Sequence, residues 1–63
     1  MFEIKPISYK KANSPTTIRF TEELFSELKE VAANAGVSFN SLVLQACEYA
    51  LKDLPEEIKT PHE

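Results

Sequence analysis

Two segments of this 63-residue chain repeat apolar residues at intervals of three and four positions. Residues spaced in this way lie on one face of an α-helix, so the spacing predicts amphipathic helices over 22–35 and 39–54. In the first segment the apolar positions are Leu24, Phe25, Leu28, Val31, Ala32 and Ala35. In the second they are Phe39, Leu42, Val43, Leu44, Ala46, Cys47, Ala50, Leu51 and Leu54. The second stripe is broader than one partner helix covers, and we expect a second copy of the same helix to pack on it.

Both predicted helices carry local start and stop signals. Thr21 and Ser38 stand where a hydroxyl can accept a hydrogen bond from a free amide of the first turn. Gly36 is the only glycine of the chain and falls where a helix commonly ends in a left-handed residue. Pro55 cannot continue a helix, so we expect the second helix to end at residue 54.

A short alternating pattern precedes the first helix. In residues 16–20, Ile18 and Phe20 face one side of an extended chain, while Thr17 and Arg19 face the other. The pattern predicts one β-strand. A strand needs a hydrogen-bonding neighbour, and no second segment of comparable quality occurs in the chain. An antiparallel copy of the same strand from a second subunit meets this need by symmetry.

The small size of the chain leads to the same expectation. A protein of 63 residues buries too little surface for a lone core to be secure. Its single cysteine excludes an internal disulfide, and its Cys and His residues do not have the spacing of a structural zinc site. We therefore predict a homodimer whose core contains Ile18, Phe20, Leu24, Leu28, Leu42, Val43, Ala46, Cys47 and Ala50.

Composition fits a globular protein, and charge divides the chain into two parts. With 43% hydrophobic and 27% charged residues, and no membrane-spanning run or signal-peptide core, we expect a cytoplasmic protein without a membrane partner. The net charge is -3, but residues 1–20 hold four basic side chains and one acidic one, whereas residues 21–63 hold three basic and nine acidic ones. The basic end suits a polyanion, and two ordinary solvated surfaces are the alternative.

The two ends of the chain are predicted to flank the helical domain. Residues 1–15 contain two prolines and no sustained period, which predicts a basic, mobile arm in which Pro6 confines any strand to a sheet edge. Residues 55–63 predict a polar tail, with His62 as an ordinary member of it. The domain between these flanks covers residues 16–54.

The order of these features resembles one known family. An alternating strand, a threonine cap, an amphipathic helix, a glycine turn, Ser-x-Asn-Ser and a second amphipathic helix are typical of the ribbon-helix-helix family of Arc, MetJ and CopG repressors. The resemblance covers about residues 15–54 and is most specific in 17–21 and 36–41. It implies a mainly α fold with one short strand, in an intertwined homodimer whose subunits share a two-stranded antiparallel β-ribbon.

The resemblance also implies that the outward side chains of the ribbon read DNA. Those positions are held by Thr17 and Arg19, with Pro15 at the third, where proline lacks the side-chain donor that is usual in the family. The physical chemistry agrees, because a two-stranded ribbon fits the major groove and an arginine can fork onto guanine O6 and N7. An ion pair from Arg19 to Glu22 or Glu23 is the alternative.

Phosphate contacts are implied at the start of the second helix. The family places them at the first turn, here Ser38, Phe39, Asn40 and Ser41. Free amides at a helix N-terminus suit a phosphate oxygen. Lys10 and Lys11 can follow the DNA backbone from the arm, in a contact that salt weakens. As alternatives, Asn40 only supports the cap and the lysine pair is merely solvated.

The chain carries no pattern typical of catalysis. Cys47 lies on an apolar helical face with no base beside it, which favours a small core residue over a nucleophile. No acid, base and nucleophile can be grouped, so we expect no enzyme, no cofactor and no metal.

Two functions from different classes follow. The first is a dimeric transcriptional repressor that reads operator repeats in double-stranded DNA, with more than one dimer bound. The second is an antitoxin-like or adaptor dimer that chiefly binds another protein, with DNA binding secondary or absent. The arm over residues 1–15 can dock such a protein by folding on it. Residues 55–63 are short for the toxin-binding extension that antitoxins of this family carry.

Overall fold

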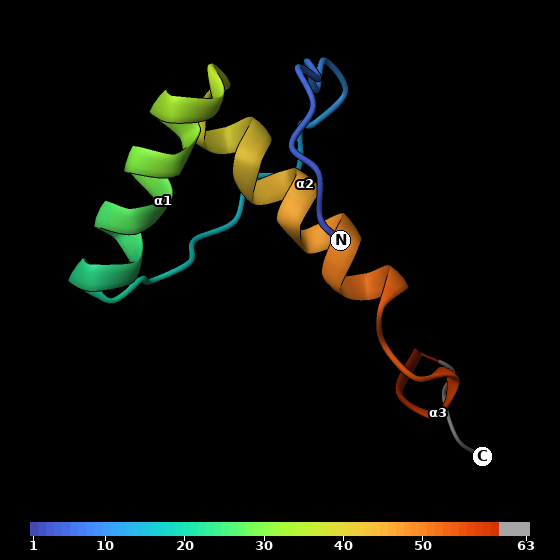
Figure 1. Ribbon diagram of the computed structural model, residues 1–63. Coiled ribbons are helices and arrows are strands. Elements are labelled where there is room, and N and C mark those ends of the chain that lie inside the picture. The colour runs from blue at the N-terminus through green and yellow to red at the C-terminus, as the bar shows by residue number, and fades with distance from the viewer. Residues whose placement is uncertain (60–63) are drawn as a thin grey trace.

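A computed structural model describes residues 1–59 of the chain and shows a mainly helical protein. The helices are α1 (Glu22–Ala35), α2 (Phe39–Lys52) and α3 (Glu56–Lys59). In Figure 1, α1 and α2 form an angled pair joined by a tight turn, and α3 continues beyond α2. The N-terminal segment runs beside α2 before the chain crosses to the start of α1. Over the described residues, none of the helices has the length and apolar run that crossing a membrane requires.

The bounds of α1 follow from its two caps. The Thr21 hydroxyl accepts a hydrogen bond from the Leu24 amide at 3.2 Å, which satisfies one donor of the first turn. At the other end Gly36 adopts a left-handed φ of 73°, which a residue with a Cβ atom adopts only at a cost. The Gly36 amide donates to the Ala33 carbonyl at 3.2 Å, as in a left-handed helix end. These are the bounds that the sequence predicts.

The second helix begins where the sequence predicts and ends earlier. Ser38 caps it by accepting a hydrogen bond from the Ser41 amide at 3.0 Å. The helix ends at Lys52, two residues before the predicted end at 54. The cause is the proline at position 55, because its ring disfavours helical geometry at the residue before it.

A one-turn helix follows where the sequence predicts only a polar tail. The amides of Ile58 and Lys59 donate to the Pro55 carbonyl at 3.1 and 3.2 Å. Proline suits the start of this turn, since the first amides of a helix have no acceptor within it. The remainder of the predicted tail, residues 60–63 with His62, lies outside the described residues.

The two long helices share a very small apolar core. Ala32 and Leu42 are 3% and 2% exposed, and they are the only buried apolar side chains among residues 1–59. The Phe39 ring lies 5.3 Å from Phe25 and 5.9 Å from Phe20 between centroids, which adds a half-covered aromatic cluster. Larger apolar side chains stay exposed, among them Ile7, Ile18, Leu24, Val31, Tyr49, Leu51 and Ile58. The helix pair alone therefore buries little of the apolar surface that the sequence provides.

Residues 16–20 form no strand in the single chain, which differs from the sequence prediction. They cross from the arm to α1 on an irregular path (Figure 1), and their backbone groups make no hydrogen bond within the described residues. The physical reason is that a strand requires a paired neighbour, and residues 1–59 contain no other strand.

The N-terminal arm is docked on α2, whereas the sequence predicts a mobile segment. Lys5, Ile7 and Tyr9 are hydrogen-bonded to side chains of α2. The Phe2 ring lies 5.2 Å from the Tyr49 ring. Docking occurs because one face of α2 offers donors and acceptors to backbone groups that would otherwise need water.

Candidate nucleic-acid interface

The three predicted base-reading residues lie in one exposed stretch ahead of α1. Pro15, Thr17 and Arg19 are all exposed. Phe20 is half-buried in the aromatic cluster, and this contact anchors the end of the stretch against both long helices. Ile18 is 57% exposed, although the alternation assigns it to the core side. The stretch therefore presents polar groups to solvent together with an apolar side chain that the described residues do not cover.

Arg19 has no acidic partner within residues 1–59. Neither Glu22 nor Glu23 forms an ion pair with it, so the structure does not contain the alternative contact that the sequence leaves open. The guanidinium keeps its five donors available in a planar fork. This is the geometry that guanine recognition requires.

The first turn of α2 offers two free amides. Those of Phe39 and Asn40 have no acceptor in the described part of the chain, while that of Ser41 is used by the cap. The Asn40 side chain is exposed and forms no hydrogen bond to the cap in the described part of the chain. The Phe39 ring belongs to the aromatic cluster, so Phe39 can offer only its amide. Such amides, at the positive end of a helix dipole, suit a phosphate oxygen.

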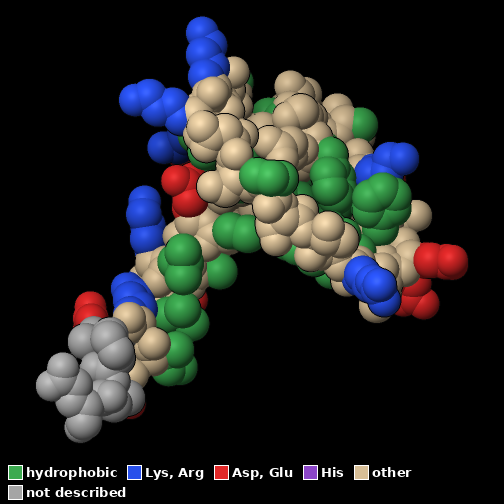
Figure 2. All heavy atoms as spheres, turned by 180° about the vertical axis from the view of Figure 1, so that it is seen from behind, with side chains coloured by type: hydrophobic (Ala, Val, Ile, Leu, Met, Phe, Trp, Pro, Cys, Tyr) green, Lys and Arg blue, Asp and Glu red, His purple; other side chains and the backbone are tan. Residues whose placement is uncertain are grey.

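Lys10 and Lys11 lie in a tight turn that is separate from the first turn of α2. The Ala12 amide closes this turn by donating to the Tyr9 carbonyl at 3.3 Å. Both lysines border a hollow whose opposite wall is formed by Leu44, Cys47, Glu48 and Leu51. Figure 1 places this turn far from the entry to α1, and Figure 2 shows the basic side chains in separate groups. The structure does not bring the lysine pair together with Arg19.

An open apolar hollow of about 620 Å³ lies between residues 12–20 and one side of α2. Its apolar walls include Ile18, Phe20, Phe39, Val43, Leu44 and Cys47. Four of these six residues are predicted members of the dimer core, and they come from two separate segments of the chain. The structure therefore gathers Ile18, Phe20, Val43 and Cys47 on one open surface.

The other five predicted core residues differ in how far the single chain buries them. Leu42 is buried within the single chain, and Leu28 and Ala46 are half-buried. Leu24 and Ala50 are exposed. Leu42 thus belongs to the core of the helix pair itself, whereas the exposed residues add to the apolar surface.

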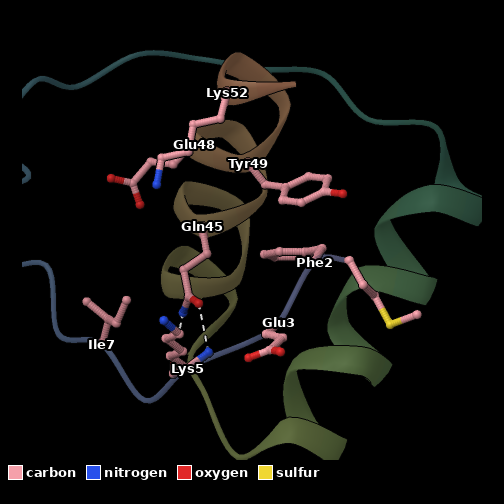
Figure 3. A pocket seen from close by; sticks show the side chains of 9 residues that line it. Phe2, Glu3, Lys5, Ile7, Gln45, Glu48, Tyr49 and Lys52 are labelled. Carbon is pink, nitrogen blue, oxygen red and sulfur yellow. Dashed lines mark hydrogen bonds between the residues drawn. The ribbon is translucent and has the colours of Figure 1, made fainter. Parts of the chain in front are cut away.

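The largest set of polar contacts joins the arm to α2 (Figure 3). Gln45 Oε1 accepts from the Lys5 amide at 2.8 Å, and Gln45 Nε2 donates to the Lys5 carbonyl at 2.7 Å. The Ser41 hydroxyl donates to the Ile7 carbonyl at 2.8 Å and accepts from Gln45 Nε2 at 3.0 Å. Gln45 and Ser41 are 4% and 5% exposed. One side-chain amide therefore pairs with both backbone groups of one residue, much as a neighbouring strand would.

The arm reverses direction after Ile7 and is held again at Tyr9. The Tyr9 hydroxyl donates to Glu48 Oε1 at 2.6 Å. This hydrogen bond is the main reason why the pKa of Tyr9 is raised to about 12, with lesser contributions from desolvation and from the negative charge of Glu48.

Sequence reasoning assigns no role to Gln45 and predicts Ser41 as a phosphate ligand. The structure turns both side chains toward the arm, so the Ser41 hydroxyl proton is already engaged. Their spacing of four residues is a signal that they share one helix face. The spacing does not identify what they bind, because the groups bound are backbone atoms that every residue carries.

The described residues form no arrangement with evident catalytic chemistry. Cys47 is exposed and lines both the apolar hollow and the hollow bordered by Lys10 and Lys11, but within the described residues its thiol forms no hydrogen bond. Among residues 1–59 no three His, Cys, Asp or Glu side chains are grouped to hold a metal ion. The chemically distinctive features are the exposed Arg19, the free amides at the start of α2 and the docked arm.

Comparison with protein-family models, with curated proteins and with solved structures found no match to this chain.

Proposed function

We propose that the protein is a homodimeric, sequence-specific DNA-binding transcriptional repressor of the ribbon-helix-helix type. Residues 16–20 of two copies pair as an antiparallel ribbon, and Thr17 and Arg19 of each copy enter the major groove. The observation that carries this proposal is the unpaired backbone of residues 16–20, which lies directly beside an open apolar hollow. Ile18, in this segment, is exposed and lines the hollow.

The dimer is supported by the amount of apolar surface that the single chain leaves in water. Only Ala32 and Leu42 are buried apolar residues among residues 1–59, which is far too few for an independent core. Green side chains in Figure 2 gather where the helix pair opens and continue toward the C-terminal end. A second copy is the occupant that fits, because it supplies both the missing strand edge and a matching apolar face in one symmetric contact.

The DNA-binding role is supported by two sets of unsatisfied donors. Arg19 is exposed without an acidic partner and Thr17 stands on the same side of the alternation. The free amides of Phe39 and Asn40, with the Asn40 side chain, are suited to phosphate. Two copies related by symmetry double both sets, so the dimer reads repeated operator half-sites. Pro15 contributes shape alone at the third position.

Selection of bound sequences from random duplexes, at one fixed salt concentration, tests this proposal. We expect enrichment of a repeated motif, since base contacts discriminate whereas phosphate contacts do not. Enrichment of no motif by a confirmed dimer would exclude sequence-specific repression.

A protein-interaction dimer is the second candidate, and one observation favours it. Leu51 and Ile58 are exposed near the C-terminal end of the described chain, and neither lines the hollow beside residues 16–20. An apolar surface of this kind suits a partner protein of the antitoxin-like or adaptor class. The same selection separates the two candidates, because this one predicts a stable dimer without an enriched motif.

A further inference from the structure

The docking of the arm on α2 is specific in its geometry. Gln45 binds the amide and the carbonyl of Lys5, and Ser41 binds the carbonyl of Ile7. The Tyr9 hydroxyl bond to Glu48 and the ring contact of Phe2 with Tyr49 hold the two ends. Three successive turns of α2 thus contribute to the same contact. An arm that lay there by chance would not satisfy both the oxygen and the nitrogen of the buried Gln45 side chain.

The same contact is easily reversed. The arm residues from Pro6 to Ser8 are exposed even when docked. Release of the arm places Gln45 and Ser41 on the open surface of a helix, where water can replace each lost hydrogen bond. Most of the contacts given up are hydrogen bonds, and the ring contact of Phe2 with Tyr49 joins two residues that are themselves only half-buried or exposed. The short connection to α1 keeps the released arm close by, so redocking is an intramolecular event.

The docked arm withholds groups that suit phosphate. It engages the hydroxyl proton of Ser41, in the first turn of α2. It also holds Lys10 and Lys11 beside α2 at the level of Cys47 and Leu51. Cys47 lies about 12 Å along the helix from the free amides at its start, at 1.5 Å per residue. A released arm frees the hydroxyl and both lysines at once.

We infer that residues 2–9 are a reversible latch on the Ser41–Gln45 face of α2, and that the docked latch holds the free protein in a state of low affinity for double-stranded DNA. The effect on DNA rests on the proposed function, whereas the latch itself does not. Binding to DNA releases the arm, because the phosphates then compete for the arm lysines and for Ser41.

The latch is tested with the full chain and Gln45→Ala. Alanine favours the helix, so α2 should remain intact while both bonds to Lys5 are lost. We expect trypsin to cleave after Lys10 and Lys11 about tenfold faster, as the loss of two ordinary hydrogen bonds predicts for the population of the released arm. The nuclear Overhauser contact between the Phe2 and Tyr49 rings should disappear. Asn34→Ala, which removes an exposed amide from α1, should leave both measurements at their wild-type values.

A second variant removes one contact at the other end of the latch. Tyr9→Phe keeps the ring and loses only the hydrogen bond to Glu48. It should accelerate the same cleavages by a smaller factor than Gln45→Ala. Unchanged cleavage and an unchanged ring contact in both variants would overturn the latch.

The effect on DNA is tested with a mixed random-sequence duplex as the probe. At low salt Gln45→Ala should bind it about threefold to tenfold more tightly than the wild type. Its plot of log affinity against log salt should be steeper by about 2, because two further lysines then meet phosphates. A released arm with unchanged or weaker duplex binding would overturn the low-affinity state. If neither the wild type nor Gln45→Ala bound the duplex, the proposed function would be overturned. The latch would then still be supported by the cleavage measurements.

Discussion

At the scale of single residues, the environment of Arg19 differs from that of Lys29 and Lys59. Lys29 lies over the Phe25 ring at 5.2 Å and Lys59 donates to the Lys52 carbonyl at 3.4 Å, whereas Arg19 has no such contact within the described residues. The neighbouring ring of Phe20 is fixed in the aromatic cluster, which limits the freedom of the backbone that carries Arg19. An exposed, unpaired guanidinium on a restrained backbone is well placed for recognition.

Arg19→Ala and Arg19→Lys together separate charge from geometry. We expect Arg19→Ala to lose about 1–3 kcal/mol of discrimination for each guanine that it reads, measured with the selected duplex against a scrambled one. Arg19→Lys should lose nearly the same discrimination, because an ammonium cannot form the planar fork, but it should keep the salt-dependent, non-specific part of binding. Helix content should be unchanged in both. Full discrimination by Arg19→Ala would move base reading to another residue.

The phenol of Tyr9 makes the contact with Glu48 dependent on pH. The pKa of Tyr9 is raised from 10.0 to about 12 in the folded chain, chiefly by the hydrogen bond to Glu48. Because the protonated form is favoured by folding, its contribution is complete below pH 10 and is lost as the pH rises through 12. A nuclear magnetic resonance titration of the Tyr9 ring should show a midpoint near pH 12. Glu48→Gln should move that midpoint down toward 10.0, and an unmoved midpoint would contradict the assigned cause.

At the scale of elements, local chemistry determines what can be predicted from sequence. The bounds of α1 are predictable because Thr21 and Gly36 act on their immediate neighbours. The end of α2 before residue 54 is predictable in the same way, because proline disfavours a helical backbone conformation at the residue that precedes it. The strand over 16–20 does not form in the single chain, because pairing is non-local. The docked arm was not predictable, because the groups that Gln45 binds are backbone atoms without a sequence signature.

The turn between α1 and α2 provides a prediction about stability. Gly36 has a left-handed φ of 73°, and a Cβ atom built there would have no heavy atom within 4 Å. The cost of Gly36→Ala is therefore backbone strain alone, and we expect it to lower the free energy of unfolding by about 1–2 kcal/mol. Gly36→Asn should cost less, because asparagine tolerates this conformation. Chemical denaturation of the two variants under identical conditions measures the difference, and equal losses would show that φ is not the cause.

At the scale of the whole molecule, most of the large apolar side chains of the described residues remain at least partly exposed. The core residues Ala32 and Leu42 join α1 to α2, but the hollow that contains Ile18, Val43 and Cys47 faces solvent. The arm covers the polar Ser41–Gln45 face of α2. It therefore leaves this apolar hollow open. A second copy can therefore dock on the hollow while each arm remains on its own helix. The dimer and the latch are thus compatible in one particle.

A matched pair of isoleucine substitutions tests the shared ribbon. Ile18 and Ile58 are 57% and 67% exposed in the single chain, so a monomer would tolerate Ile18→Ser and Ile58→Ser about equally. In the dimer only Ile18 becomes buried, and each copy loses about 1.5–3 kcal/mol on substitution, or about 3–6 kcal/mol for the dimer. Sedimentation should give twice the chain mass for the wild type and Ile58→Ser at micromolar concentration, with a midpoint of thermal unfolding that rises with protein concentration. Ile18→Ser should unfold at lower temperature and dissociate at higher concentration. In an obligate dimer, dissociation and unfolding coincide. A fully helical wild-type monomer at micromolar concentration would therefore refute the shared ribbon. Equal effects of the two substitutions would place the interface elsewhere.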